Sequence, residues 1–369
     1  MKHSDDVIPA SRVPDLLWPE VLASFDRAAF ERDGYWVWKG VLTKAGCKQW
    51  TASLKKLQQM NDDVITDTNW ASIDFAGRGL EPPLPAQVTP EYLAACRGGS
   101  EQMPGFLRTS ECRHYMHDRG LFGPGPALVT RGFESQGVMP EYFPGAYDDF
   151  ILDVTTAHPQ MMELFGKLLG DRFIIDHCLT LNRTPGSKGR RWHAHPYRDG
   201  QYEVDDPVGT GKAVTPEFLQ RQCVRTLCYP EGATLEDGGE LAVIPGGHLY
   251  RIPYRWNTKR PDDDAAIRTG WLKGKNHAVT SKPLEIVHLS MPPGSMVSFV
   301  HHMPHYVGYR QPRVATRWGL LMAFRTPDPE ATPAKWSEGV PAHWAKRVEA
   351  AGHLSSEARR VFEGDVPLH

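Results

Sequence analysis

The sequence predicts a mainly β protein with flanking helices. Short apolar runs separated by turn residues recur through the second half of the chain, whereas longer helical patterns come before them. This distribution is typical of an all-β barrel or sandwich with helices packed around it. The chain has 369 residues, of which 40% are hydrophobic, so it can bury one large core. It contains no repeat, low-complexity tract or Pro/Ser-rich linker, and we expect a single domain over residues 1–369.

The first 60 residues predict N-terminal helices and one strand. A helix is expected over residues 18–32, a turn at Asp33-Gly34, and a short strand over residues 35–38. A second helix is expected over residues 44–60, with Thr43 as its N-cap.

Residues 61–145 have weak periodicity and many glycines and prolines, with aromatic residues scattered among them. A long irregular segment inside a compact domain is often functional, so it is either a lid over a pocket or a surface excursion packed by its own aromatics.

A helix is then expected over residues 148–169, ended by Gly170, and a β core over residues 172–325. A polar stretch at residues 251–282 indicates an insertion between strands, and residues 327–369 form a polar tail with helical pieces. The expected strands cover residues 172–175, 179–183, 191–197, 224–229, 239–244, 284–289, 296–300 and 317–325.

The composition excludes several classes of function. The formal net charge is −2, so no basic field favours nucleic acid or an anionic membrane. There is no apolar run of 18 residues, and the polar start of the chain does not resemble a signal peptide. The six cysteines form no CxxC motif, and buried free thiols are expected at Cys223 and Cys228. We therefore expect a cytoplasmic protein that acts on a small molecule.

The strongest candidate site is the segment Trp192-His193-Ala194-His195. Side chains at i and i+2 of a strand share a face, so His193 and His195 could bind one metal ion, with His305 reaching it from a distant strand. Imidazole suits iron, copper, nickel and zinc alike. The chain has 16 histidines and will contain some close pairs by chance, of which His301-His302 is another.

The order of several segments resembles the phytanoyl-CoA dioxygenase family of iron(II)- and 2-oxoglutarate-dependent oxygenases. Members open with Phe-x-x-Asp-Gly-Tyr, here at residues 30–35, and carry Trp-His-x-Asp where this chain has Trp192-His193-Ala194-His195. A Val-Ile-Pro-Gly turn ending in histidine follows at residues 243–248, then a Gly-led segment from Gly294 and the distal His305. The similarity spans roughly residues 25–325 in the same order.

The resemblance implies a double-stranded β-helix core of the jelly-roll or cupin-like type. It also implies Fe(II), 2-oxoglutarate and O₂ as cofactor and cosubstrates, with His193 and His305 as metal ligands. Arg317 falls where the family places the arginine that binds the far carboxylate of 2-oxoglutarate, which a planar guanidinium can hold by two hydrogen bonds. Arg310 and Arg313 compete for this role, whereas His248 is expected to be structural.

Position 195 departs from the family, because a histidine replaces the ligating aspartate. His195 could complete a three-histidine triad, or Asp199 or Glu203 could supply the missing carboxylate. Alternatively, the pocket has lost redox chemistry. A halide-binding variant is disfavoured, because it needs a small residue at this position.

These observations predict a non-haem iron oxygenase that hydroxylates or otherwise oxidises C–H bonds of a small organic molecule, with 2-oxoglutarate as cosubstrate. Two alternatives stay open. One is a cupin-like three-histidine dioxygenase that does not use 2-oxoglutarate, and the other is a non-catalytic β-barrel that binds a metal or ligand.

Overall fold

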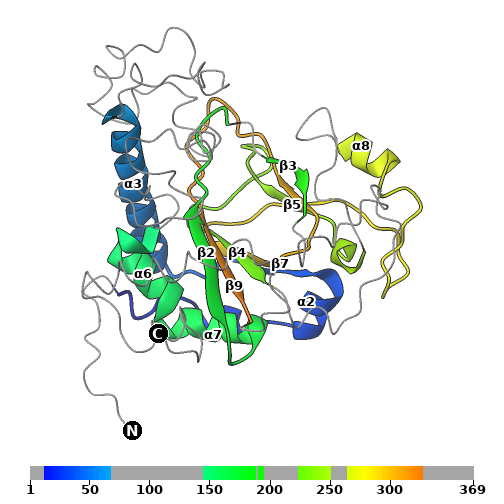
Figure 1. The fold of residues 1–369 in the computed structure, drawn as a ribbon, viewed down its shortest axis with the longest axis horizontal. Coiled ribbons are helices and arrows are strands. Elements are labelled where there is room, and N and C mark those ends of the chain that lie inside the picture. The colour runs from blue at the N-terminus through cyan, green and yellow to red at the C-terminus, as the bar shows by residue number, and fades with distance from the viewer. Residues whose placement is uncertain (1–11, 68–143, 188–189, 195–222, 251–263, 327–369) are drawn as a thin grey trace, which may run out of the picture.

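The computed structural model describes residues 12–67, 144–187, 190–194, 223–250 and 264–326. Within these ranges two antiparallel sheets face each other, with helices on their outer sides (Figure 1). The helices are α1 (Pro19–Ala23), α2 (Arg27–Asp33), α3 (Lys44–Asp67), α6 (Asp149–Thr156), α7 (Pro159–Leu169) and α8 (Asp264–Thr269), with 3₁₀ turns η4 (Pro144–Ala146) and η6 (Gly247–Leu249). The strands are β1 (Tyr35–Trp38), β2 (Ile174–Thr180), β3 (Arg190–His193), β4 (Val224–Tyr229), β5 (Leu241–Val243), β6 (Val287–Leu289), β7 (Ser295–Val300), β8 (His305–Val307) and β9 (Leu320–Arg325).

The strands from β2 onward are distributed between the two sheets. The five-stranded sheet has the order β1-β7-β4-β9-β2, and the four-stranded sheet has the order β3-β8-β5-β6. The chain therefore passes from β2 in the larger sheet to β3 in the smaller, back to β4, and across again to β5 and β6 before it returns to β7. It crosses once more to β8 and ends in β9, so strands far apart in sequence become neighbours.

The alternation of side chains along each strand defines an interior face and an outer face for the larger sheet. Phe299 of β7 points inward, since its ring lies 4.8 Å from that of His305 in the smaller sheet. On the other face, Phe324 of β9 stacks on Phe165 of α7 with ring centroids 3.8 Å apart. Figure 1 shows α3, α6 and α7 on this outer side, whereas α8 lies near β3 and β5.

Two predicted helices are each divided in the structure. The helix expected over residues 18–32 is α1 and α2, because Asp26 accepts a hydrogen bond from the backbone N–H of Ala29 and caps a new helix. The helix expected over residues 148–169 is α6 and α7. Pro159 begins α7, and a proline disfavours helical geometry in the residue before it. Both single-helix predictions were wrong, although the end at Gly170 is confirmed.

The strand predictions were mostly confirmed, with differences in their limits. The predicted strands at residues 172–175 and 179–183 are one strand, β2, with an irregularity between Ile175 and His177. The strands expected at residues 35–38 and 224–229 match β1 and β4. Gly46 donates its backbone N–H to the Thr43 hydroxyl, which confirms the predicted cap of α3.

Several predictions concern residues outside the described part of the chain. Most of the lid-like segment (residues 61–145) and the whole C-terminal tail (residues 327–369) fall there, as do His195, Asp199 and Glu203. The expected insertion at residues 251–282 is described from residue 264 onward, where it includes α8. The single-domain organisation stays a prediction.

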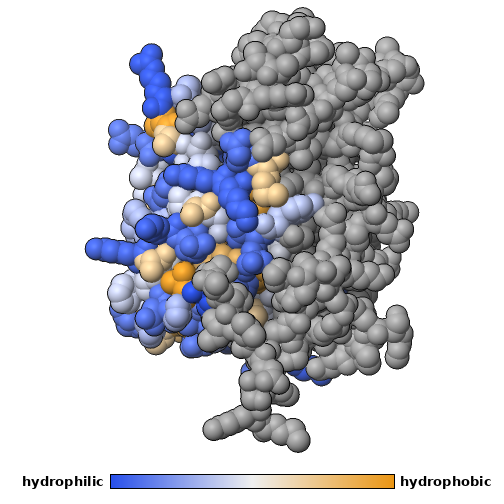
Figure 2. All heavy atoms as spheres, turned by 90° about the vertical axis from the view of Figure 1, so that its left-hand side faces the viewer, coloured by the Kyte–Doolittle hydropathy of each residue, from blue (hydrophilic) through white to orange (hydrophobic). Residues whose placement is uncertain are grey.

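The described surface on the side of α3 and α6 is mostly hydrophilic, with small scattered apolar patches (Figure 2). Over the described residues, no helix is both long and apolar enough to cross a bilayer. The thiols of Cys223 and Cys228 are buried and free, as expected.

Gly34 ends α2 at a position that no other residue fits without strain. Its φ is +79°, and a Cβ atom built there would lie 2.3 Å from Nδ1 of His248. We expect Gly34→Ala to lower the free energy of unfolding in urea by about 3 kcal/mol, from backbone strain plus the steric clash. Gly274 is the matched control, because it has φ +72° and open space around its Cβ position. Gly274→Ala should cost about 1 kcal/mol, and equal losses in the two variants would contradict the packing at Gly34.

Candidate metal and cosubstrate site

His193 and His305 lie directly opposite each other in the antiparallel pair of β3 and β8. Their ring centroids are 4.1 Å apart, and the His305 side chain is buried. Since opposite residues of an antiparallel pair share one face, both imidazoles point into the space between the two sheets. Two residues 112 positions apart in sequence therefore form one potential ligand pair.

The backbone of β3 and β8 explains this register. Pro304 precedes β8 and has no N–H to donate, so the ladder begins at His305. A shift between Arg190 and His193 gives β3 one residue more than β8 over the same span. Such a bulge re-aims side chains, and here Trp192 and His193 emerge on opposite faces. The predicted strand at residues 191–197 thus ends at His193 among the described residues, and Ala194 is already outside it.

The hydrogen bonding of His305 favours metal ligation through Nε2. Its Nδ1 lies 2.7 Å from the carbonyl oxygen of Met303. Because a carbonyl only accepts, Nδ1 carries the proton and the neutral ring keeps a lone pair on Nε2. Metal-binding histidines are usually held in this way, with the second ring nitrogen donating to an acceptor.

The described residues contain no group of three His, Cys, Asp or Glu side chains arranged to hold a metal. His193 and His305 therefore account for two donors of a possible site. The third candidate, His195, lies outside the described residues, and so do Asp199 and Glu203.

Arg317 also faces the interior. Leu321 of β9 lies on the face opposite to that of the outward Phe324, and Arg317 precedes Leu321 by an even number of residues. The backbone of Arg317 lies opposite that of Arg183. Its side chain is buried and donates to the carbonyl oxygens of Gly239 and Leu181, the latter at 2.7 Å. Among the described residues, its Nε has no hydrogen-bond partner. Burial lowers the pKa of Arg317 to about 10, so the guanidinium stays charged at neutral pH.

Tyr229 of β4 is a candidate that the sequence interpretation missed. The Arg317 guanidinium lies 4.9 Å from the centre of the Tyr229 ring, and the buried Tyr229 hydroxyl has no hydrogen-bond partner in the part of the chain that the structure describes. A buried polar group without a partner is uncommon and needs an explanation. The only signal in the sequence was the place of Tyr229 in the side-chain alternation of β4. This alternation directs Tyr229 inward, as it does other core residues, and so does not distinguish it.

The other predicted candidates have different roles. Arg310 donates to the carbonyl oxygens of Gly238 and Ala315, and Arg313 is exposed.

The second histidine pair of the sequence, His301-His302, has other partners. His301 accepts a hydrogen bond from Nε of Arg225 through its Nδ1, and Nε2 of His302 contacts the Tyr250 carbonyl oxygen. These contacts join His301 and His302 to different groups and give no sign of a metal ion shared by the two rings.

His248 has a structural environment, as the sequence predicted. It is fully buried, its Nε2 donates to the carbonyl oxygen of Glu31 at 3.1 Å, and burial lowers its pKa to about 3. A neutral ring at ordinary pH suits its position against Gly34.

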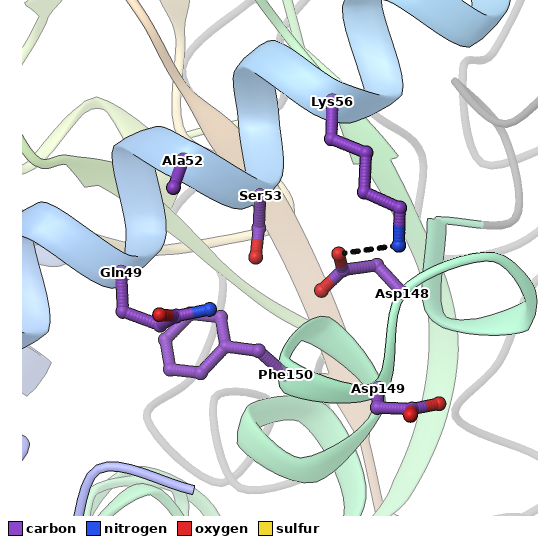
Figure 3. Close-up of a pocket in the computed structure, with 7 residues that line it drawn as sticks. All are labelled: Gln49, Ala52, Ser53, Lys56, Asp148, Asp149 and Phe150. Atoms are coloured by element: carbon purple, nitrogen blue, oxygen red, sulfur yellow. Dashed lines mark hydrogen bonds and ion pairs between the residues drawn. The ribbon is translucent and has the colours of Figure 1, made fainter. Parts of the chain in front are cut away.

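A cavity of about 310 Å³ lies between α3 and α6, on the outer side of the larger sheet (Figure 3). The ion pair of Lys56 and Asp148, 3.1 Å apart, borders it. None of its lining residues belongs to the interior site: they are Gln49, Ala52, Ser53, Lys56, Asp148, Asp149 and Phe150.

Comparison of the sequence with protein-family models and with curated proteins gave no match. Among solved structures, EvdMO1 is 19% identical over 46% of this chain, with a TM-score of 0.31, and the match spans only 32% of EvdMO1. The non-haem α-ketoglutarate-dependent epimerase SnoN from nogalamycin biosynthesis is 14% identical over 84% of each chain, with a TM-score of 0.41. EctD from S. alaskensis, solved with 2-oxoglutarate and 5-hydroxyectoine, is 14% identical over 90% of this chain and 89% of its own, with a TM-score of 0.39.

The opposite hydrogen-bonding roles of Nδ1 in His305 and His301 can be tested without a metal. In ¹⁵N NMR of histidine-labelled protein above pH 7.5, the neutral His305 ring should show a protonated Nδ1, and the neutral His301 ring a protonated Nε2. His305→Ala and His301→Ala assign the two signals. A protonated Nε2 in neutral His305 would contradict the ligand geometry.

Proposed function

We propose that this protein is a non-haem iron(II) oxygenase that uses 2-oxoglutarate to oxidise a C–H bond of a small organic molecule. His193 and His305 hold the metal, and His195 supplies the third protein ligand. The proposal combines the resemblance of residues 25–325 to the phytanoyl-CoA dioxygenase family with the interior site of the barrel.

The observation that carries the proposal is the facing pair of imidazoles. His193 and His305 meet across β3 and β8 with ring centroids 4.1 Å apart, and the Met303 carbonyl accepts the Nδ1–H of His305, which places the lone pair of the neutral ring on Nε2. Two imidazoles side by side between the sheets suit a transition metal such as iron. The donor set present therefore fits the metal that the resemblance implies.

The strand order supports a double-stranded β-helix. From β2 to β9, the chain crosses repeatedly between two four-stranded sets, β2-β9-β4-β7 and β3-β8-β5-β6, with only β5 and β6 following each other in the same set, and β1 extends the first set. In this arrangement the ligand-bearing strands β3 and β8 are neighbours, so the fold itself brings His193 to His305.

Arg317 and Tyr229 provide a site for the far carboxylate of 2-oxoglutarate. The Nε–H of Arg317 and the hydroxyl of Tyr229 are buried donors in the same interior as the histidines, and neither has a hydrogen-bond partner among the described residues. A carboxylate bound there would supply the acceptors that both groups lack. The carbonyls of Gly239 and Leu181 hold the guanidinium in place, so little side-chain freedom is lost on binding.

Bound iron(II) and 2-oxoglutarate together would supply the oxidising chemistry. The residues of this chain position these groups and exclude water from them. Phe299 packs against the His305 ring at 4.8 Å and forms an apolar wall beside the ligand pair. The buried Arg317 neutralises one carboxylate, and the histidines donate without adding negative charge.

The activity can be tested by oxygen uptake with Fe(II), screening small organic substrates. We expect uptake to require 2-oxoglutarate and to yield succinate, and both His193→Ala and His305→Ala to abolish it. Uptake that is independent of 2-oxoglutarate would instead favour a cupin-like dioxygenase. Absence of iron affinity in the wild type would leave only a binding protein.

The role of His195 is tested by the pair His195→Ala and His195→Asp. If His195 is the third ligand, the alanine variant should lose at least tenfold in Fe(II) affinity, whereas the aspartate variant should retain binding. Unchanged affinity in both variants would contradict the three-histidine ligand set and favour Asp199 or Glu203.

Arg317 and Tyr229 predict two separable effects on 2-oxoglutarate. Tyr229→Phe should weaken 2-oxoglutarate binding about tenfold while changing the stability of the unliganded protein by less than about 0.5 kcal/mol, because its hydroxyl has no partner to lose among residues 12–67, 144–187, 190–194, 223–250 and 264–326. Arg317→Met should weaken binding at least about a hundredfold. The exposed Arg313, mutated to Met, is the control, and a loss of binding in that variant equal to that of Arg317→Met would contradict the assignment.

A further inference from the structure

The outer face of the smaller sheet carries a polar cluster that the proposed reaction does not use. His288 of β6 pairs with Ala242 of β5, which pairs with Tyr306 of β8, so these side chains share one face. Trp192 of β3 lies on the same face and packs on Tyr306, with ring centroids 4.8 Å apart. This face is covered by apolar residues of α8 and the segment after it, among them Ile267 and Trp271.

His288 bridges two carboxylates. Its Nδ1 lies 3.1 Å from Oε1 of Glu240, and its Nε2 lies 2.8 Å from Oδ2 of Asp264, the first residue of α8. Ionised carboxylates only accept hydrogen bonds, so both ring nitrogens carry protons and the ring is an imidazolium. The hydrogen bonds to Asp264 and Glu240 raise the pKa of His288 to about 9.

The same cluster contacts the residues next to both metal-ligand candidates. The other oxygen of Asp264, Oδ1, accepts a hydrogen bond from Nε1 of Trp192 at 3.2 Å. The Tyr306 ring meets the His288 ring edge-on, at 5.8 Å between centroids. Trp192 directly precedes His193, and Tyr306 directly follows His305. His288, Asp264, Trp192 and Tyr306 thus form a closed ring of contacts behind the ligand pair.

Strand β3 depends on these contacts more than its neighbours do. In the described part of the chain it is an edge strand, paired only with β8 through Arg190 and His193 around a bulge. The hydrogen bond from Trp192 to Asp264 is therefore a second anchor for the strand that carries His193.

We propose that His288 is a positioning residue for the metal site, holding α8 and the outer faces of β3 and β8 together so that His193 stays opposite His305. This inference rests on the proposed function. The groups that face His288 are Asp264 from α8, Glu240 next to β5 and Tyr306 from β8. Without the cation, the two carboxylates would repel each other and Asp264 would release Trp192.

The test is a Co(II) titration of the full chain, followed by the d–d absorption of the bound ion. His288→Gln removes the charge and should weaken Co(II) binding about tenfold or more, the scale typical of groups that orient metal ligands. His288→Arg keeps a cation with several donors and should stay within about threefold of wild type. His277→Gln is the control and should leave Co(II) affinity unchanged. His277 lies away from the ligand strands, where its Nε2 is 3.3 Å from Oδ1 of Asp33.

Three outcomes would overturn the positioning role: wild-type affinity in His288→Gln, equal losses in the Gln and Arg variants, or an equal loss in His277→Gln. His305→Ala separates this failure from that of the proposed function. If His305→Ala abolishes Co(II) binding and His288→Gln does not affect it, only the positioning role fails. If the wild type does not bind Co(II), or His305→Ala binds it equally well, both proposals fail.

The charge of His288 also predicts a pH dependence of stability. Because its pKa is raised on folding from 6.5 to about 9, its stabilising effect is complete below pH 6.5 and is lost as pH rises through 9. The difference in unfolding free energy between wild type and His288→Gln, measured in urea, should therefore shrink as pH rises through this window. A difference independent of pH would contradict the imidazolium bridge.

Discussion

The antiparallel pairing of β3 with β8 is the constraint on which the candidate site depends. It brings together two histidines that lie 112 residues apart and gives both rings the same direction. The pairing is short and bulged, so backbone hydrogen bonds alone hold it weakly. On the β8 side it begins directly after Pro304, which has no N–H to donate. A one-residue slip would turn one of the two rings to the outer face. The remaining strands matter to function mainly because they place β3 beside β8.

The two faces of the smaller sheet have different electrostatic character. The interior face carries His193 and His305 and meets the buried cation of Arg317, so it suits a metal together with an anionic cosubstrate. The outer face carries one cation and two carboxylates, in which the His288 imidazolium lies between Asp264 and Glu240. Trp192 and Tyr306 connect the two faces through the backbone, since each is adjacent in sequence to a ligand candidate. The stability of the outer cluster is therefore coupled to the geometry of the inner one.

Local sequence patterns predicted those strand limits and helix ends that depend on neighbouring residues alone. The alternation and apolar content of residues 224–229 gave β4 its observed limits, and Gly34 and Gly170 ended helices as expected. The helix at residues 18–32 was wrong because the Asp26 cap outweighed a continuous periodic pattern. The three-residue β8 was missing from the expected strands, since its ladder is defined by its partners β3 and β5 rather than by its own composition. Likewise, His193 and His305 were found by motif and order, whereas no local signal distinguished Tyr229 and His288 from other residues of their strands. Their roles arise from contacts between distant segments: Tyr229 meets Arg317, and His288 meets Glu240, Asp264 and Tyr306.

We propose that His193 and His305 hold one iron ion between the two sheets while Arg317 binds 2-oxoglutarate. Anomalous diffraction at the iron edge, from crystals grown without oxygen in Fe(II) and 2-oxoglutarate, tests it most directly. We expect one strong peak about 2.1 Å from Nε2 of His305 and from a ring nitrogen of His193, a normal length for bonds between transition metals and imidazole nitrogen. Electron density for the far carboxylate should lie at Nε of Arg317 and the Tyr229 hydroxyl. A peak bound elsewhere, or none between the two histidines, would contradict their assignment as metal ligands.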